Sequence, residues 1–276
     1  MSLRQRQEIQ EVPRGELTPE RYASLALEVA AEAATLVLEG YRKRPAPTEK
    51  ARADLVTEFD LKSEQHIVAR LSAATPELGL VAEERGGAQP DGPTWFCDPL
   101  DGTTNFVHGH PFWSVSIGLL DRGAPIAGAV VAPALGLTWV GYRGGPALRS
   151  GDACHVSETS ELDQALLATG FPADRQLAPQ NNLDTFARVK KVARGVRRCG
   201  SAAVDMCLVA DGTYDAYWER RLNAWDVAAG AAVLLAAGGT LSALDGGPVD
   251  LTVGHLIASN GRVHAALQRL IAADGT

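Results

Sequence analysis

Apolar residues at helical spacing alternate with short apolar runs typical of β-strands along almost the whole 276-residue chain. Thr18-Pro19 begins the first helix, because Thr is a favoured N-cap and Pro a favoured first helical residue. The expected helices span 19–41, 60–74, 181–194, 202–210, 225–236 and 263–273. The expected strands span 78–82, 95–97, 114–120, 125–131, 137–142, 165–169, 196–199, 214–218, 240–243 and 256–258. Interleaved helices and strands predict a layered α/β fold.

The length of the chain suits one large domain or two modest ones. Residues 1–17 are polar and charged, which predicts a flexible tail. The glycine-containing stretch 144–152 is expected to be a loop and a boundary between lobes. The sequence therefore predicts an N-terminal α/β lobe over 18–150 and a C-terminal α/β lobe over 151–276.

Charge and cysteine content exclude several classes of partner. The formal net charge of −7 argues against sequence-independent nucleic-acid binding and against a polybasic membrane patch. The four cysteines contain no CxxC pair, which argues against a zinc site. Residues 1–20 hold no apolar segment typical of a secretion signal, and no apolar run is long enough to cross a bilayer. We expect a cytoplasmic protein with no nucleic-acid or membrane partner.

The stretch from Trp95 to Phe106 places two carboxylates, Asp98 and Asp101, directly after an apolar run. Trp95 to Cys97 is expected to be a buried strand that Pro99 and Gly102 end. Carboxylates at a strand end can face one point, which suits a hard cation such as Mg²⁺. The Gly-Thr-Thr that follows offers N–H groups to a phosphate. An Asp-rich surface turn is the alternative interpretation.

Other blocks accompany this one in a fixed order. They are Asp54-Leu55-Val56-Thr57-Glu58-Phe59-Asp60, Ala82-Glu83-Glu84, Gly200-Ser201-Ala202-Ala203 and Ala224-Trp225-Asp226-Val227-Ala228-Ala229-Gly230. Together they resemble the signature blocks of the inositol monophosphatase family over roughly residues 20 to 265. The resemblance implies an αβαβα sandwich of the inositol monophosphatase and fructose-1,6-bisphosphatase type, with two or three Mg²⁺ ions between two lobes.

The resemblance also implies a role for each matching residue. The implied metal ligands are Glu83, Asp98, the Leu100 carbonyl, Asp101 and Asp226. The implied catalytic residues are Asp60, Thr103 and Glu83, of which Asp60 and Thr103 orient and activate the attacking water. The implied substrate-binding residues are Gly102, Thr103, Gly200, Ser201, Ala202 and Glu219. Each acid has a plainer alternative, because Asp60 and Asp226 suit helix N-termini and Glu219 suits a charged strand end. Thr103 could equally be a helix cap.

The implied activity is the Mg²⁺-dependent, lithium-sensitive hydrolysis of inositol 1-phosphate or a similar polyol phosphate by direct attack of water. A homodimer is implied as well. A histidinol-phosphate, fructose-1,6-bisphosphate or nucleotide 3′-phosphate phosphatase of the same superfamily is the alternative. Arg220 and Arg221 could read a second phosphate or form surface ion pairs, and Asp205 could face the polyol or the helix exterior. A non-catalytic binding protein on this scaffold is the remote alternative.

Overall fold

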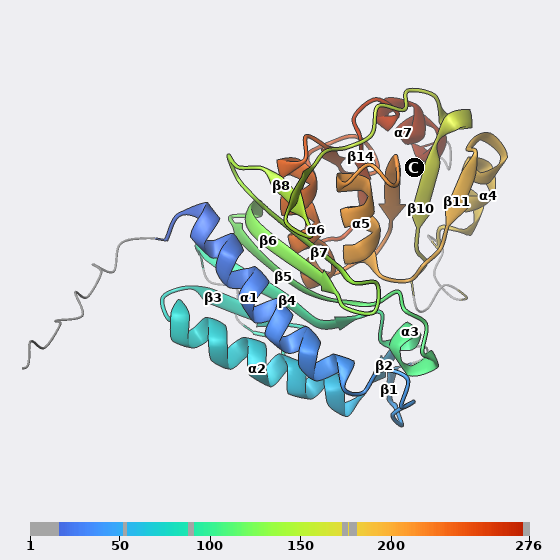
Figure 1. The fold of residues 1–276 in the computed structure, drawn as a ribbon. Helices are drawn as coiled ribbons and strands as arrows, with labels where there is room; N and C mark the ends of the chain where they lie inside the picture. The colour runs from blue at the N-terminus through green and yellow to red at the C-terminus, as the bar shows by residue number, and fades with distance from the viewer. Residues whose placement is uncertain (1–16, 52–53, 88–90, 173–175, 177–180, 273–276) are drawn as a thin grey trace, which may run out of the picture.

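Helices and sheets alternate in five layers in the computed structural model, which describes residues 17–51, 54–87, 91–172, 176 and 181–272 (Figure 1). The outer layer contains α1 (Pro19–Leu38) and α2 (Glu58–Ala74), which cover one face of a seven-stranded sheet. The middle layer contains α5 (Ala202–Ala210) and α6 (Ala224–Ala236). A five-stranded sheet follows, and α4 (Leu183–Val192) and α7 (His264–Ala272) lie on its far face. The αβαβα sandwich is therefore confirmed, while the expected tail lies outside the described residues apart from Leu17.

The two sheets use separate parts of the sequence. The order in the larger sheet is β3 (Gly79–Ala82), β4 (Pro93–Asp101), β5 (Ser114–Asp121), β6 (Ala124–Ala132), β7 (Leu137–Tyr142), β8 (Ala147–Arg149) and β9 (Asp152–Cys154). Only its β3–β4 pair is parallel. The order in the smaller sheet is β11 (Gly195–Arg197), β10 (Leu166–Thr169), β12 (Ala216–Glu219), β14 (Leu256–Ser259) and β13 (Thr240–Ser242). Here β10 is parallel to both of its neighbours.

Short elements complete the chain. Strands β1 (Thr48–Ala51) and β2 (Asp54–Val56) pair as an antiparallel hairpin ahead of α2. The six-residue helix α3 (Thr103–His108) follows β4, and the 3₁₀ helix η1 (Leu162–Gln164) precedes β10. Among the described residues, no helix is long and apolar enough to cross a membrane.

The expected loop over 144–152 is wrong in part, because it contains β8 and the start of β9. These strands form an antiparallel hairpin that extends the larger sheet, with Arg149 opposite Asp152. The turn residues Ser150 and Gly151 both have positive φ, at 50° and 93°. Two consecutive positive φ values are typical of a tight hairpin turn, so the Ser-Gly pair was the signal that the sequence interpretation missed.

Strand β4 runs further than expected, past Pro99 to Asp101. Asp98 pairs with Ser116 and Asp101 pairs with Ser114, so β4 holds one residue more than β5 between these pairs. This bulge contains Pro99, which has no N–H to give to a neighbouring strand and is tolerated at such irregularities. The bulge lies between the two carboxylates of the signature and re-aims the end of the strand.

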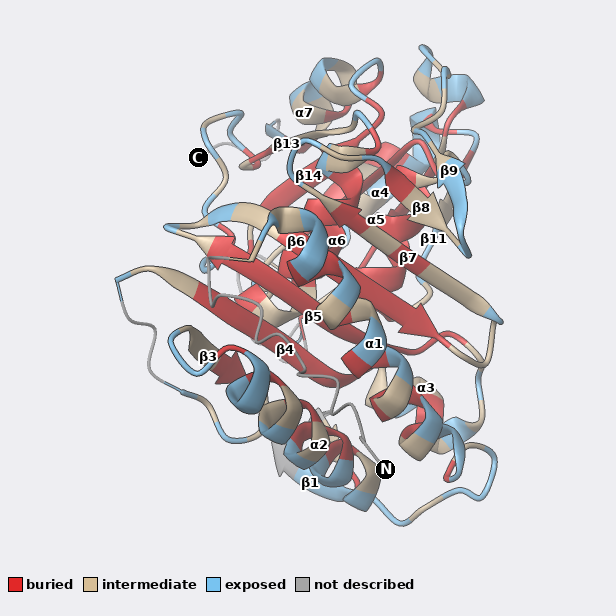
Figure 2. Cartoon of the chain, turned by 60° about the vertical axis from the view of Figure 1, so that its left-hand side comes forward, coloured by how far each residue is buried: buried red, intermediate tan, exposed pale blue. Residues whose placement is uncertain are grey.

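The larger sheet is buried on both faces, and Figure 2 shows its central strands buried while α1 and α2 are exposed on their outer sides. On the inner face, α6 approaches the strands at glycines. A Cβ at Gly118 or Gly128 would stand within 2.6 Å of the α6 backbone. Only glycine permits this approach, which brings the N-terminus of α6 close to the end of β4.

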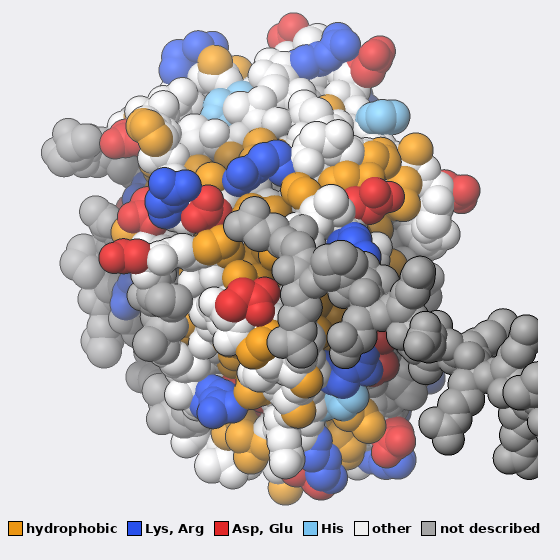
Figure 3. Space-filling model, turned by 90° about the vertical axis from the view of Figure 1, so that its left-hand side faces the viewer, with side chains coloured by type: hydrophobic (Ala, Val, Ile, Leu, Met, Phe, Trp, Pro, Cys, Tyr) orange, Lys and Arg blue, Asp and Glu red, His pale blue; other side chains and the backbone are white. Residues whose placement is uncertain are grey.

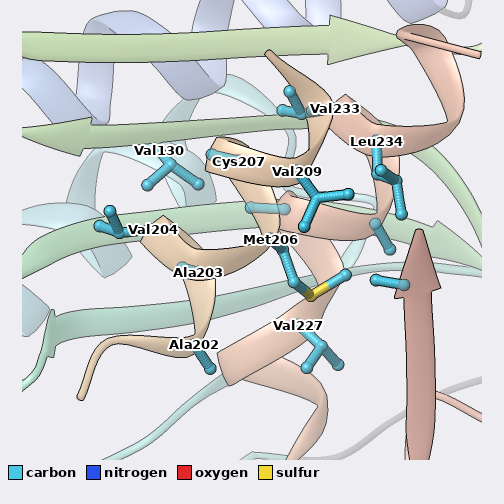
Figure 4. Packing of buried hydrophobic residues seen from close by; sticks show 14 of the residues in the cluster. Val130, Ala202, Ala203, Val204, Met206, Cys207, Val209, Val227, Val233 and Leu234 are labelled. Atoms are coloured by element: carbon cyan, nitrogen blue, oxygen red, sulfur yellow. The ribbon is translucent and has the colours of Figure 1, made fainter. Parts of the chain in front are cut away.

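Helices α5 and α6 pack directly on each other between the sheets. Figure 4 shows the Met206 side chain of α5 beside Val227 of α6. A Cβ at Gly230 would stand 2.8 Å from the Met206 Cβ, so the two helices are in close contact. Both helices are buried almost throughout, which fixes their N-termini relative to the larger sheet.

Candidate active site

A cavity of about 510 Å³ collects most of the residues that the sequence singles out. The five expected metal ligands, Glu83, Asp98, Leu100, Asp101 and Asp226, all line it. Three of the expected substrate residues, Gly102, Thr103 and Gly200, line it too. Segments from both halves of the chain therefore meet at one open site, whose volume is typical of a small-molecule pocket.

Strand pairing brings the first carboxylates together. Strands β3 and β4 are parallel with Ala82 opposite Cys97, so the residues that follow each of these two emerge at the same edge. The Glu83 N–H donates to the Cys97 carbonyl oxygen at 3.2 Å. Glu83 and Asp98 consequently lie side by side, although they are fifteen positions apart in the sequence.

Asp226 reaches the same cavity from the N-terminus of α6. Its Oδ2 accepts a hydrogen bond from the Asn223 N–H at 2.6 Å, and the two residues form a capping box. The helix-acid role considered for Asp226 is therefore real. It coexists with the position of Asp226 on the cavity wall.

The acidic side chains repel one another when no cation is present. Burial, followed by the charges of Glu83, Asp101 and Asp226, raises the pKa of Asp98 well above its ordinary value. Burial raises the pKa of Asp101 to about 6, against the opposing hydrogen bond from Ser201. Burial also raises the pKa of Asp226, with Asp101 and Glu83 adding to the effect. A divalent cation would remove this cost, which is why the group fits Mg²⁺.

Among the described residues, no three acidic, histidine or cysteine side chains already form a ligand set for a single ion. This arrangement still suits Mg²⁺. That ion usually keeps several waters and takes one or two carboxylates together with phosphate oxygens, rather than an all-protein cage. The carboxylates and the Leu100 carbonyl could hold such ions in the cavity.

Asp60 and Thr103 form a hydrogen-bonded pair at the edge of the site. The Thr103 hydroxyl lies 3.0 Å from Asp60 Oδ1 and 3.0 Å from the Leu100 carbonyl oxygen, and it can donate to either. Asp60 Oδ2 accepts from the Thr57 N–H at 2.8 Å and from its hydroxyl at 2.6 Å, as the capping box of α2. Burial raises the pKa of Asp60, and these hydrogen bonds oppose the rise.

The helix-acid interpretation of Asp60 is correct, since its side chain caps α2. The same carboxylate also accepts a hydrogen bond from the Thr103 hydroxyl, and its catalytic role stays a prediction. The helix-cap interpretation of Thr103 is wrong. Gly102 is the N-cap of α3, and the Thr103 hydroxyl points to Asp60 and Leu100 instead. Thr103 itself lines the cavity.

Asp101 connects the signature segment to α5. Its Oδ2 accepts from the Ser201 hydroxyl at 2.5 Å and from the Ala203 N–H at 2.9 Å. The N-cap of α5 is Ser201, so this carboxylate holds the start of that helix. The Gly200-Ser201-Ala202 block is thereby placed beside the expected metal ligands. Ser201 and Ala202 support the wall and do not themselves line the cavity.

Glu219 is buried and is not among the residues that line the cavity. It accepts a hydrogen bond from the Tyr217 hydroxyl. Burial raises the pKa of Glu219 to about 7, while the Tyr217 hydrogen bond and the charge of Arg198 oppose the rise. The strand-end interpretation is therefore incomplete, because a solvated strand-end charge would be exposed.

Asp205 is buried rather than on a helix exterior, and its Oδ1 has no hydrogen-bond partner among the residues that the structure describes. Arg220 and Arg221, in contrast, lie outside the cavity lining. Burial lowers the pKa of His255, and the charges of Arg220 and Arg221 lower it further, so both arginines lie near that ring. The hypothesis that these two arginines read a second phosphate receives no support from their positions.

Five further residues line the cavity: Leu55, Thr104, Asn105, Phe171 and Arg198. The sequence analysis placed Thr104 near the phosphate, as part of the Gly-Thr-Thr segment, and assigned the other four no place in the site. Leu55 and Asn105 belong to signature blocks, and Arg198 stands two residues before the Gly200 block, so position alone could have indicated these three. Phe171 carries no comparable signal in the sequence.

Comparison with known proteins places this site in a family. The model of the inositol monophosphatase family matches residues 18–274. An inositol-1-monophosphatase from Synechocystis sp. is 40% identical over 255 residues, which is 91% of this chain and 89% of the relative. The Nus factor SuhB of Pseudomonas aeruginosa is 38% identical over 252 residues, which is 88% of this chain and 93% of that protein.

The fold gives the same result. The structure of an inositol monophosphatase from Anabaena superposes with a TM-score of 0.84 at 35% sequence identity and covers 92% of this chain and 96% of that chain. The family match extends over nearly the whole chain and includes every signature block around the cavity. The chain therefore belongs to the inositol monophosphatase family of phosphatases.

Proposed function

We propose that this protein is a Mg²⁺-dependent phosphatase that releases phosphate from inositol 1-phosphate or a closely similar polyol phosphate. One observation carries the proposal above all: Glu83, Asp98, Asp101 and Asp226 line one cavity although they come from distant parts of the chain. Two or three Mg²⁺ ions are the cofactor of the proposal. The raised pKa of Asp98 and of Asp226 supports it, because these carboxylates need a positive partner to remain charged.

The residues of the site divide the work of hydrolysis. When bound, the Mg²⁺ ions supply the water activation, the neutralisation of phosphoryl charge and the stabilisation of the leaving alkoxide. Asp60 fixes the Thr103 hydroxyl by accepting its hydrogen bond, which leaves the Thr103 oxygen free to accept from a water molecule. Gly102 and Thr103 present N–H groups to the phosphate. Water attacks phosphorus, the bond to the polyol oxygen breaks, and no phosphoenzyme forms.

Replacing Thr103 with Val tests the water-orienting role. Val keeps the shape of Thr but loses the hydroxyl, so we expect kcat to fall about a hundredfold, the usual scale for a group that helps a proton transfer. KM should change little, because Val leaves the backbone N–H groups in place. Thr103→Ser should recover most of the rate. Unchanged kcat in Thr103→Val would show that the hydroxyl has no catalytic role.

Catalysis is favoured over a binding role on this scaffold. One relative, from Pseudomonas, is named a Nus factor, and that name describes the relative and not this chain. In this chain, every acid expected to hold a metal is present and lines the cavity. Substrate preference within the superfamily is the finer part of the proposal, together with lithium inhibition, a homodimer and a cytoplasmic location.

Phosphate release from a panel of esters tests the proposed function. We expect Mg²⁺-dependent release from inositol 1-phosphate, suppressed by Li⁺, at a higher kcat/KM than from fructose 1,6-bisphosphate, histidinol phosphate or 3′-phosphoadenosine 5′-phosphate. A higher kcat/KM for one of the other three would keep the metal site and change the substrate. No turnover of any ester would contradict the proposal and favour the binding role.

A further inference from the structure

Arg198 is the one basic side chain that lines the acidic cavity in the described part of the chain. It follows β11 and precedes the Gly200 block. The side chain is exposed, and no hydrogen bond or ion pair involves it within the described residues. An arginine with five donors and no protein partner is available to a ligand.

The backbone that carries Arg198 is held in place from the signature segment. The Asn105 Nδ2 donates to the Cys199 carbonyl oxygen at 2.8 Å and to the Phe112 carbonyl oxygen at 2.6 Å. The next residue, Gly200, has φ of 93°, a conformation that favours glycine. A Cβ at Gly200 would stand 2.4 Å from Arg198 Nη1, so the guanidinium lies over this glycine. Arg198 lines the cavity, so its guanidinium lies beside Gly200 on the cavity wall.

The charge of Arg198 affects the pKa of three acidic groups, although it forms no ion pair with any of them. The arginine lowers the pKa of Asp101, of Glu219 and of Asp205, against the larger effect of burial on each. All three carboxyl groups are buried, and Asp101 is already engaged by Ser201 and Ala203. The exposed guanidinium therefore keeps its donors for something in the cavity.

The reacting phosphate has other sources of positive charge in the proposed function. With three Mg²⁺ ions, the upper number proposed, the ionic charge would balance the four carboxylates and a doubly charged phosphate. The positive charge of Arg198 is then not needed to neutralise the reacting phosphate. Arginine is well suited to recognising a phosphate or carboxylate group through paired N–H donors.

We propose that Arg198 is a specificity-determining residue that binds a second anionic group on the substrate. For a given polyol or sugar, an ester that carries a second phosphate or a carboxylate would then bind more tightly than the corresponding monophosphate. This inference rests on the proposed phosphatase function and narrows its substrate class. It also assigns the binding of a second anion to Arg198, which lines the cavity, in place of Arg220 and Arg221.

Matched pairs of substrates test this role. We expect the wild-type protein to have a lower KM for inositol 1,4-bisphosphate than for inositol 1-phosphate, and for fructose 1,6-bisphosphate than for fructose 1-phosphate. Arg198→Ala should raise KM for at least one bisphosphate about tenfold, the scale of one charged hydrogen bond, and leave the monophosphates within about twofold. Arg198→Lys should recover part of the loss, and Arg197→Ala is the control because Arg197 is exposed and absent from the cavity lining.

Calorimetry separates this inference from the proposed function. Binding of each substrate is measured with Ca²⁺ in place of Mg²⁺, so that turnover is not needed, and circular dichroism checks the fold of each variant. A selective loss of bisphosphate binding in Arg198→Ala supports the role, even if the wild-type protein releases no phosphate. Equal losses for monophosphates and bisphosphates, or no bisphosphate preference in either pair, overturn it.

Discussion

Asp101→Asn is expected to lower kcat for inositol 1-phosphate by at least about a thousandfold at saturating Mg²⁺, because a neutral amide is a poor ligand for this ion. Asn has nearly the same shape as Asp, so the substitution should keep the local packing. An Asn oxygen can still accept from the Ser201 hydroxyl and the Ala203 N–H, which lie 2.5 Å and 2.9 Å from Asp101 Oδ2. The start of α5 should therefore stay in place while the charge is lost.

Phosphate release and thermal unfolding, measured on the same preparations, check this prediction. Asp152→Asn is the matched control, since Asp152 is exposed at the start of β9. It should leave both activity and stability unchanged. Turnover near the wild-type level in Asp101→Asn would remove Asp101 from the metal-ligand set and, with it, the main support for the proposed function.

Mg²⁺ is expected to stabilise the folded protein far more at about pH 8 than at about pH 5. The pKa of Asp101, an expected Mg²⁺ ligand, is raised to about 6, mainly by burial. Burial and neighbouring charges also raise the pKa of Asp98 and of Asp226. A carboxyl group with a raised pKa binds its proton more tightly when folded. Its stabilising effect is complete below the ordinary pKa and is lost as the pH rises through the folded pKa.

Without metal, the free energy of unfolding contributed by these acids should therefore fall between about pH 5 and pH 8, together on the order of 3 kcal/mol. Mg²⁺ binds the carboxylates once they have lost their protons. The increase in the free energy of unfolding on adding Mg²⁺ should therefore be larger at the higher pH, by an amount similar to that loss. Urea unfolding with and without Mg²⁺ at each pH measures this difference. Burial also lowers the pKa values of His255 and His264. Their titration changes the stability equally with and without Mg²⁺ at a given pH, so it cancels in the difference. An equal gain at both pH values would show that Mg²⁺ does not bind these carboxylates.

The layered fold could be predicted because its elements follow local rules. The pattern of apolar residues places most helices and strands, and Thr18 and Pro19 mark the start of α1 as expected. The β8–β9 hairpin was missed because its strands have only three residues each and resemble a glycine-containing loop. The bulge of β4 was missed because proline usually ends a strand, whereas here a register shift accommodates it.

The surface offers less to a sequence argument than the core. Figure 3 shows one face on which basic and acidic side chains are interspersed with apolar ones, so neither sign dominates there. Arg198 illustrates the difficulty. In the sequence it is one of two adjacent arginines, and only the fold separates it, on the cavity wall, from Arg197. Arg220 and Arg221 are equally near a signature block in sequence, yet they lie outside the cavity lining.

The predicted carboxylates meet in the cavity for reasons that lie close to them in the sequence. The parallel pairing of β3 with β4 brings Glu83 to Asp98, and the capping box of α6 holds Asp226. Glu219 and Asp205 differ, because their burial depends on contacts between α5 and the smaller sheet. No local pattern reports that depth. Motifs therefore predicted which carboxylates meet in the cavity better than they predicted which side chains are buried around it.

Titration of Mg²⁺ into metal-free protein, with phosphate release from inositol 1-phosphate as the readout, tests the central claim most directly. The account predicts no release without metal and a rate that rises to saturation as Mg²⁺ is added. A chelator should abolish that rate, and fresh Mg²⁺ should restore it. Release that continues unchanged in the presence of the chelator would contradict the assignment of the Glu83, Asp98, Asp101 and Asp226 cavity as a magnesium-dependent active site.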